Sequence, residues 1–207
     1  MAGCADRAVQ EPALYVVKPQ DTLYSIAWRN GVDFHDLARW NNIGPDFRIA
    51  VGQALRLSPS ARAPPLAGSK NIESPANAKP PAAAGPSSRA WAWPTDRLSA
   101  PQPVPSGGII LQGRDGQDIR AASSGRVVYT GNGIRGYGNL IIIKHGENLL
   151  SAYAHNRDSL VRDGQEVTLG QVIGHMGEGV PQKPALYFEI RRNGKPVDPL
   201  AFLPKSN

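Results

Sequence analysis

The stretch RVVYTGNGIRGYGNLIIIKHGENLLSAYAHN, residues 126–156, decides the class of fold in the larger part of this chain. Residues 126–130 alternate between polar and apolar side chains, whereas residues 140–143 form a continuous apolar run. Residues 149–153 are a third β-prone segment, and a Gly-Glu-Asn turn at 146–148 separates it from the second. Short β-branched and aromatic runs divided by glycine turns are typical of antiparallel strands. The stretch therefore predicts neighbouring strands with a hairpin at residues 146–148.

Residues 131–136 within this stretch match the pattern G-x-G-x-x-G. A dinucleotide-binding fold needs a helix directly after that pattern, because the helix N-terminus holds the pyrophosphate. Here Tyr137, Gly138 and Asn139 lead into the next predicted strand instead. We therefore interpret residues 131–136 as a hairpin loop and not as a nucleotide site.

The β-type pattern continues over the rest of the C-terminal segment. Residues 166–167, 171–173 and 186–190 complete the expected strands, and no helical period of useful length occurs. We expect residues 91–207 to form a mainly antiparallel all-β domain of the sandwich or barrel type.

Residues 14–58 carry a different pattern. A β-prone run at 14–17 is followed by Asp21, a candidate helix N-cap, and then by apolar residues at helical spacing. Asp33 is expected to cap a second helix, and residues 51–57 have the alternation of a strand. The segment predicts a small α+β domain with the order β-α-α-β.

The composition limits what else the chain contains. Its 207 residues include 19 Pro and 22 Gly, and proline, alanine and serine are concentrated in residues 59–90, which we expect to form a flexible Pro/Ala-rich linker. The single cysteine, Cys4, excludes an intramolecular disulfide framework. No apolar run is long enough to span a membrane. The net charge of +6 is spread along the chain, so we expect no nucleic-acid partner.

The N-terminal segment resembles the LysM family along its whole length. The resemblance rests on Tyr15, Val17, Asp21, Thr22, Leu23, Ile26, Ala27, Asp36, Leu37, Asn41, Asn42, Val51, Gly52, Gln53 and Leu55. LysM modules bind N-acetylglucosamine-containing glycans, and the resemblance implies a glycan site made by two loops, containing Gln20, Asp21 and Thr22 in the first and Asn42, Ile43 and Gly44 in the second. Gln20 departs from the family, which usually has glycine there. Helix capping is the structural alternative for Asp21 and Thr22.

Residues 91–207 resemble the LytM, or lysostaphin-type, peptidase family. The resemblance rests on the motifs Trp93-Pro94-Thr95, Tyr137-Gly138-Asn139, Tyr153-Ala154-His155, Phe188-Glu189-Ile190-Arg191 and Pro196-Val197-Asp198-Pro199. Active members hold one zinc through a His-x-x-x-Asp pair and the second histidine of a His-x-His. The matching positions here are Ser106, Ile110 and Tyr187, so all three ligands are replaced. The resemblance therefore implies a degenerate domain with no metal, no cofactor and no catalytic residue.

The first four residues, ending in Cys4, look like the end of a bacterial lipobox. In that motif the cysteine is acylated, so residues 1–13 are expected to be a lipobox-like segment that anchors the protein to a membrane through Cys4. An exposed, reduced cysteine is the alternative interpretation.

Together these segments resemble the NlpD family of murein hydrolase activators. The resemblance implies a periplasmic protein, an outer-membrane lipoprotein, that activates zinc-dependent N-acetylmuramoyl-L-alanine amidases in septal peptidoglycan splitting. The residues carried over to its partner groove are Tyr137, His155, Asn156, Tyr187 and Glu189. Two alternatives stay open: a residual zinc metallo-endopeptidase acting on peptidoglycan, and a passive wall-binding lipoprotein.

Overall fold

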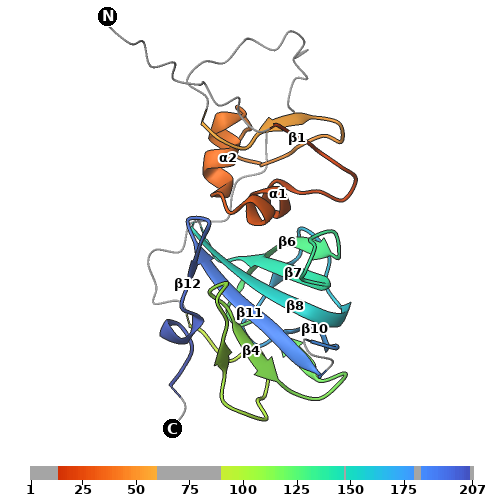
Figure 1. Cartoon of the computed structure of the whole chain (residues 1–207), viewed down its shortest axis with the longest axis vertical. Coiled ribbons are helices and arrows are strands. Elements are labelled where there is room, and N and C mark those ends of the chain that lie inside the picture. The colour runs from red at the N-terminus through yellow and green to blue at the C-terminus, as the bar shows by residue number, and fades with distance from the viewer. Residues whose placement is uncertain (1–13, 60–89, 147, 180–182, 206–207) are drawn as a thin grey trace, which may run out of the picture.

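The computed structural model describes residues 14–59, 90–146, 148–179 and 183–205. These residues form two parts stacked along the long axis: a small α/β unit, here called the N-terminal module, and a larger β domain (Figure 1). The expected fold class, a β-α-α-β unit followed by a mainly antiparallel β domain, is confirmed. The predicted lipobox-like segment lies outside the described residues, as does nearly all of the predicted linker.

The N-terminal module consists of β1 (Leu14–Val16), α1 (Leu23–Asn30), α2 (Phe34–Trp40) and β2 (Ala54–Arg56). The two strands pair antiparallel, with Tyr15 opposite Leu55. Leu23 and Ile26 of α1, Leu37 of α2 and Leu55 of β2 are all 0% exposed, so both helices bury their apolar stripes against the strands.

The cap of α1 differs from the prediction by one residue. Thr22, not Asp21, is the N-cap: its hydroxyl accepts a hydrogen bond from the Ser25 backbone N–H at 3.1 Å. The Ser25 hydroxyl in turn accepts one from the Thr22 N–H at 3.0 Å, which completes a capping box. The prediction for α2 is confirmed, because the Asp33 carboxylate accepts the His35 N–H at 2.8 Å.

The β domain is built from one large sheet with short additions. Its strands are β3 (Gln102–Pro103), β4 (Ile109–Gln112), β5 (Asp118–Arg120), β6 (Gly125–Gly131), β7 (Asn139–Lys144), β8 (Leu149–Ser159), β9 (Glu166–Val167), β10 (Val172–Met176), β11 (Ala185–Arg192) and β12 (Lys195–Val197), followed by the short 3-10 helix η1 (Pro199–Ala201). The main order is β3-β4-β11-β8-β7-β6-β9, with β10 beside β8 and β5, and β12 beside β11.

The strands predicted from residues 126–156 are confirmed as β6, β7 and the first part of β8. The G-x-G-x-x-G stretch lies in the loop from β6 to its antiparallel neighbour β7, as predicted. Strand β4 was not predicted. It pairs with β11 so that Ile110 lies directly opposite Tyr187.

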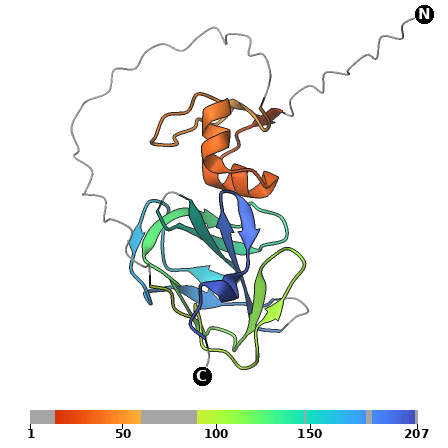
Figure 2. The same cartoon turned by 90° about the vertical axis from the view of Figure 1, so that its left-hand side faces the viewer.

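The two faces of the central sheet pack into two different cores. Ile141, Ile143 and Phe188 point into the interior of the β domain. Ile142, Ala152 and Tyr187 belong instead to a cluster that also contains the core of the N-terminal module. The blue turn between β11 and β12 reaches the underside of that module in Figure 2. Period-2 alternation therefore assigns one sheet face to the domain interior and the other to the contact between the two parts.

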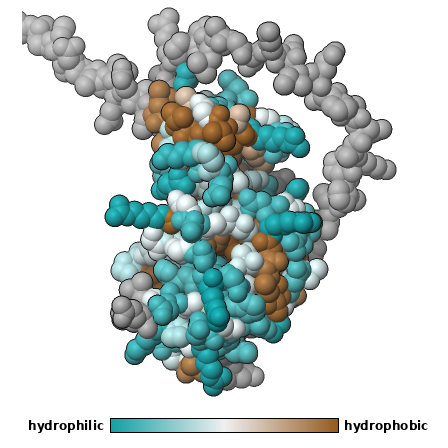
Figure 3. Space-filling view, turned by 90° about the vertical axis from the view of Figure 1, so that its right-hand side faces the viewer, coloured by the Kyte–Doolittle hydropathy of each residue, from teal (hydrophilic) through white to brown (hydrophobic). Residues whose placement is uncertain are grey.

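In the view of Figure 3, one group of exposed apolar side chains lies over the β domain, and another lies at the end of the molecule occupied by the N-terminal module. Leu14, Val16 and Val51 are 64%, 55% and 66% exposed there. Among the described residues, no helix has the length and apolar character needed to cross a membrane.

Candidate functional site

The three positions that the sequence resemblance assigns to zinc ligands lie close together, on the loop after β3 and on the neighbouring strands β4 and β11. Ser106 follows β3, Ile110 lies in β4 and Tyr187 lies in β11. The hydroxyls of Ser106 and Tyr187 are 3.0 Å apart, and Ile110 pairs with Tyr187 across the two strands. Gly108 allows this close approach, because a Cβ atom there would lie 2.7 Å from Cζ of the Tyr187 ring.

These residues do not fit a zinc ion. Isoleucine offers no donor atom at position 110, and a zinc site needs three protein donors beside the open coordination position. Burial, the largest cause, and the nearby Glu189 carboxylate raise the pKa of Tyr187 far above its ordinary value, so its hydroxyl keeps its proton at neutral pH. Within the described ranges, no cluster of three or more His, Cys, Asp or Glu side chains has a metal-binding arrangement.

A buried ion pair lies next to these positions. Glu189 is 0% exposed, and its Oε1 accepts a hydrogen bond from Arg191 Nε at 2.7 Å. Its Oε2 accepts from the hydroxyl of Tyr187 at 2.7 Å and from that of Tyr137 at 3.4 Å. Burying a carboxylate away from water costs free energy unless it is paired and hydrogen-bonded. The Glu189 carboxylate is paired with the Arg191 guanidinium and accepts hydrogen bonds from two hydroxyls.

Tyr187, Glu189 and Arg191 point to one side of β11, and we call this sheet face, with Ala152 and Ala154 of β8, the partner face. The Tyr137 ring stands edge-on to Tyr187 at 5.6 Å between centroids. Arg191 was not among the residues predicted for the partner groove. Its spacing of two residues from Glu189 and four from Tyr187 could have placed it on the same face of the strand.

His155 lies beside this face in an unusual backbone conformation. Its φ of 65° is in the left-handed region, where residues other than glycine are strained. Its N–H donates to the carbonyl of Tyr137 at 2.9 Å, which ties the Tyr137 loop to β8. The ring centroid lies 6.4 Å from that of Tyr187. Burial lowers the pKa of His155, so the imidazole is neutral at neutral pH.

The side chain of Asn156, the fifth predicted groove residue, forms hydrogen bonds within the β domain. Its Nδ2 donates to the carbonyls of Tyr153 and Asn139 at 2.8 and 3.0 Å. Its Oδ1 is buried without a hydrogen-bond partner among the described residues. The structure thus brings Tyr137, His155, Tyr187 and Glu189 to one place, whereas the amide of Asn156 joins β7 to β8.

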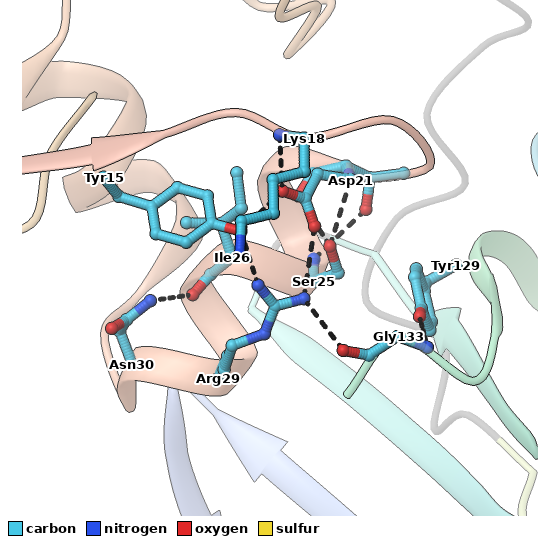
Figure 4. Close-up of polar contacts among 10 residues, drawn as sticks. Tyr15, Lys18, Asp21, Ser25, Ile26, Arg29, Asn30, Tyr129 and Gly133 are labelled. Atoms are coloured by element: carbon cyan, nitrogen blue, oxygen red, sulfur yellow. Dashed lines mark hydrogen bonds and ion pairs between the residues drawn. The ribbon is translucent and has the colours of Figure 1, made fainter. Parts of the chain in front are cut away.

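The first predicted glycan loop is held in place by a polar network (Figure 4). Oδ2 of Asp21 accepts hydrogen bonds from the Tyr15 hydroxyl at 2.6 Å and the Lys18 N–H at 2.9 Å. Arg29 Nη2 donates to its Oδ1 at 3.1 Å. The Asp21 side chain is only 6% exposed, so its carboxylate shapes the loop.

The backbone explains the glycine that the LysM family usually has before Asp-Thr. Gln20 has a φ of 68°, in the region that glycine adopts without strain. In the second loop Asn42 has a φ of 53°, which asparagine tolerates better than most residues. Gln20, Asn42 and Gly44 are exposed, while Asp21, Thr22 and Ile43 are half-buried. Their contact with glycan stays a prediction.

Comparison with known proteins agrees with this two-part organisation. Residues 15–58 match the LysM domain, and residues 104–199 match Peptidase family M23. A crystal structure of a putative peptidase M23 from Pseudomonas aeruginosa superimposes with a TM-score of 0.50 at 29% sequence identity, covering 55% of this chain and 50% of that one. These matches define a LysM module joined to a domain with the fold of the M23 peptidases.

Relatives that align with most of this chain show which family it belongs to. The chain is 40% identical to the lipoprotein NlpD/LppB homolog of Pseudomonas aeruginosa over 92% of this chain and 77% of that protein. It is 39% identical to the uncharacterized lipoprotein YgeR of Escherichia coli, covering 99% and 88% of the two chains. It is 36% identical to the murein hydrolase activator NlpD of Salmonella typhimurium, covering 92% and 68%. The chain therefore belongs to the NlpD family of murein hydrolase activator lipoproteins.

Proposed function

We propose that this protein is a non-catalytic activator of zinc-dependent N-acetylmuramoyl-L-alanine amidases that split septal peptidoglycan. One observation supports the proposal: the hydrogen-bonded Ser106 and Tyr187 and the apolar Ile110 lie together, and these are the three positions that the sequence resemblance assigns to zinc ligands. The rest of the fold is retained around them. The names of several relatives, murein hydrolase activator, support the same role.

In this proposal the partner face binds a segment of the amidase. The Tyr137 and Tyr187 hydroxyls and the neutral His155 imidazole supply hydrogen bonds, and the rings supply apolar contact. A binding protein activates an enzyme only if it binds the active conformation more tightly than the inactive one. The partner segment must therefore be more available in the active amidase than in the resting one.

The N-terminal module would hold the activator on its substrate. The exposed loop residues Gln20, Asn42 and Gly44 offer polar groups to a glycan, and half-buried Ile43 offers an apolar surface to a sugar ring. Attachment to the wall raises the local concentration of the β domain near the amidase. A lipid on Cys4, which lies outside the described residues, would add an anchor in the outer membrane facing the periplasm.

Dye release from labelled peptidoglycan sacculi tests the proposal. The full chain is assayed alone and with an N-acetylmuramoyl-L-alanine amidase from the same organism, with added zinc. We expect release only when both proteins are present. Release by the chain alone that is abolished by a chelator would establish an endopeptidase instead. Sacculus binding without any stimulation would establish a passive wall-binding protein.

Two histidine variants test whether the region around Tyr187 is the part of the protein that activates the amidase. His155→Ala removes the imidazole beside Tyr187 and is expected to raise the half-maximal activating concentration about tenfold, equivalent to ~1.4 kcal/mol of binding free energy. His175→Ala is the matched control, because His175 lies in β10 and pairs with Asp158. Equal activation by wild type and His155→Ala would show that His155 takes no part in binding the amidase.

A further inference from the structure

The N-terminal module is docked directly on the partner face. Arg191 Nη1 donates to the backbone carbonyl of Trp28 at 2.8 Å, and its guanidinium lies 3.7 Å from the centroid of the Trp28 ring. The Trp28 ring also stands edge-on to Tyr137, with 6.3 Å between centroids. One residue of α1 therefore contacts both Arg191 and Tyr137 in the proposed binding region.

Further contacts surround Trp28. Arg29 Nη2 lies 3.4 Å from the carbonyl of Gly133, in the loop between β6 and β7 (Figure 4). Lys144 Nζ, at the end of β7, is 5.0 Å from the centroid of the Phe34 ring. At the β11–β12 turn, Gly194 packs so closely that a Cβ atom there would lie 2.6 Å from the backbone nitrogen of Asp33.

The consequence is loss of access to the partner face. In the docked arrangement Tyr187, Glu189 and Arg191 are 7%, 0% and 8% exposed. Ile142 and Ala152 on the same sheet face are also fully buried, within the cluster that includes the module's core. A partner segment that binds these residues would therefore have to displace α1.

We infer that the N-terminal module closes the partner face against the amidase, and that the protein activates only after the module moves away. This inference rests on the proposed function. In the chain, residues 60–89 separate the two parts, so the docked arrangement depends on the contacts just described and not on a short connection. Closure lowers the apparent affinity for the partner by the fraction of molecules that are open.

A wedge variant at Gly194 tests closure in the full chain. Gly194 has a φ of 74°, so Gly194→Asn introduces a residue that tolerates this backbone while its Cβ collides with Asp33. Gly170→Asn is the matched control, because Gly170 has a φ of 78° and a Cβ there meets nothing within 4 Å. Trp28→Ala is a second opening variant that leaves the β domain unchanged.

Two measurements are made on each protein. Small-angle X-ray scattering gives the radius of gyration, which we expect to rise in Gly194→Asn and Trp28→Ala and to stay at the wild-type value in Gly170→Asn. Dye release with the amidase gives the half-maximal activating concentration. If the docked form outnumbers the open form about tenfold, opening lowers that concentration about tenfold.

Either measurement can overturn the inference. An unchanged radius of gyration in both opening variants would show that these contacts do not hold the module in place. An increased radius with an unchanged half-maximal concentration would show that the module does not restrict the partner face. If no protein stimulates the amidase, the proposed function fails, and scattering still decides whether the module is docked.

Discussion

The hydroxyl groups of Ser106 and Tyr187, 81 residues apart in the chain, lie 3.0 Å from each other beside Ile110. The Tyr187 hydroxyl also donates to Glu189 at 2.7 Å, so its proton has a defined acceptor. Hydrogen bonds and an ion pair thus hold these strands together where the sequence resemblance predicts that zinc ligands have been replaced. The retained geometry allows a direct test of that replacement.

Restoring the three zinc ligands is expected to create a metal site. The triple variant Ser106→His, Ile110→Asp and Tyr187→His places donors at positions that the fold already brings together. We expect the variant to retain about one zinc per chain after dialysis, and the wild type to retain none, by atomic emission. Stoichiometric zinc in the wild type would show that other residues form a site.

Removing the Glu189 carboxylate is expected to destabilise the β domain strongly. Glu189→Ala leaves the 8%-exposed Arg191 without its buried partner, which costs about 3–5 kcal/mol. Urea unfolding measures this loss. Glu166→Ala is the control, because that side chain is 75% exposed and its replacement should change the unfolding free energy by no more than about 0.5 kcal/mol. Similar losses in both variants would contradict the role of the buried pair.

The cap of α1 makes a separate prediction for the N-terminal module. Thr22→Ala removes the hydroxyl that accepts the Ser25 N–H, and is expected to cost ~1 kcal/mol. Thr22→Ser keeps a hydroxyl at this position and should stay close to wild type. Thermal unfolding followed by circular dichroism compares the three proteins. Equal unfolding temperatures for the alanine and serine variants would mean that Thr22 does not stabilise the helix.

His155 predicts how stability changes with pH. Burial holds its pKa in the folded protein below the value of about 6.5 in an unfolded chain. The unfolded state therefore binds the proton more readily, so the contribution of His155 is present above about pH 6.5 and is lost as the pH falls through the folded pKa. The unfolding free energy of wild type should fall more steeply between about pH 7.5 and 5.5 than that of His155→Gln. Parallel profiles would contradict the lowered pKa.

Local sequence patterns predicted most of the architecture. The apolar spacing around Ile26 and Leu37 and the alternation in residues 126–130 reflect helix and strand periods, which depend only on neighbouring residues. The sequence pattern did not identify the N-cap of α1 correctly. Asp21 and Thr22 are adjacent and are both good N-caps, and the choice depended on Arg29 and Tyr15, which bind the Asp21 carboxylate.

The sequence by itself determined the two parts and their classes of fold, because periodicity is a property of the residues themselves. Their donor chemistry also predicts the loss of the zinc ligands, which stays a prediction. Only the tertiary structure decided that residues 140–143 are apolar on both faces because one face packs inside the β domain and the other beneath the N-terminal module. It also decided that Arg191 donates to the carbonyl of Trp28, 163 residues away. Such a contact depends on the complementary shapes of two folded surfaces, and no local pattern encodes that complementarity.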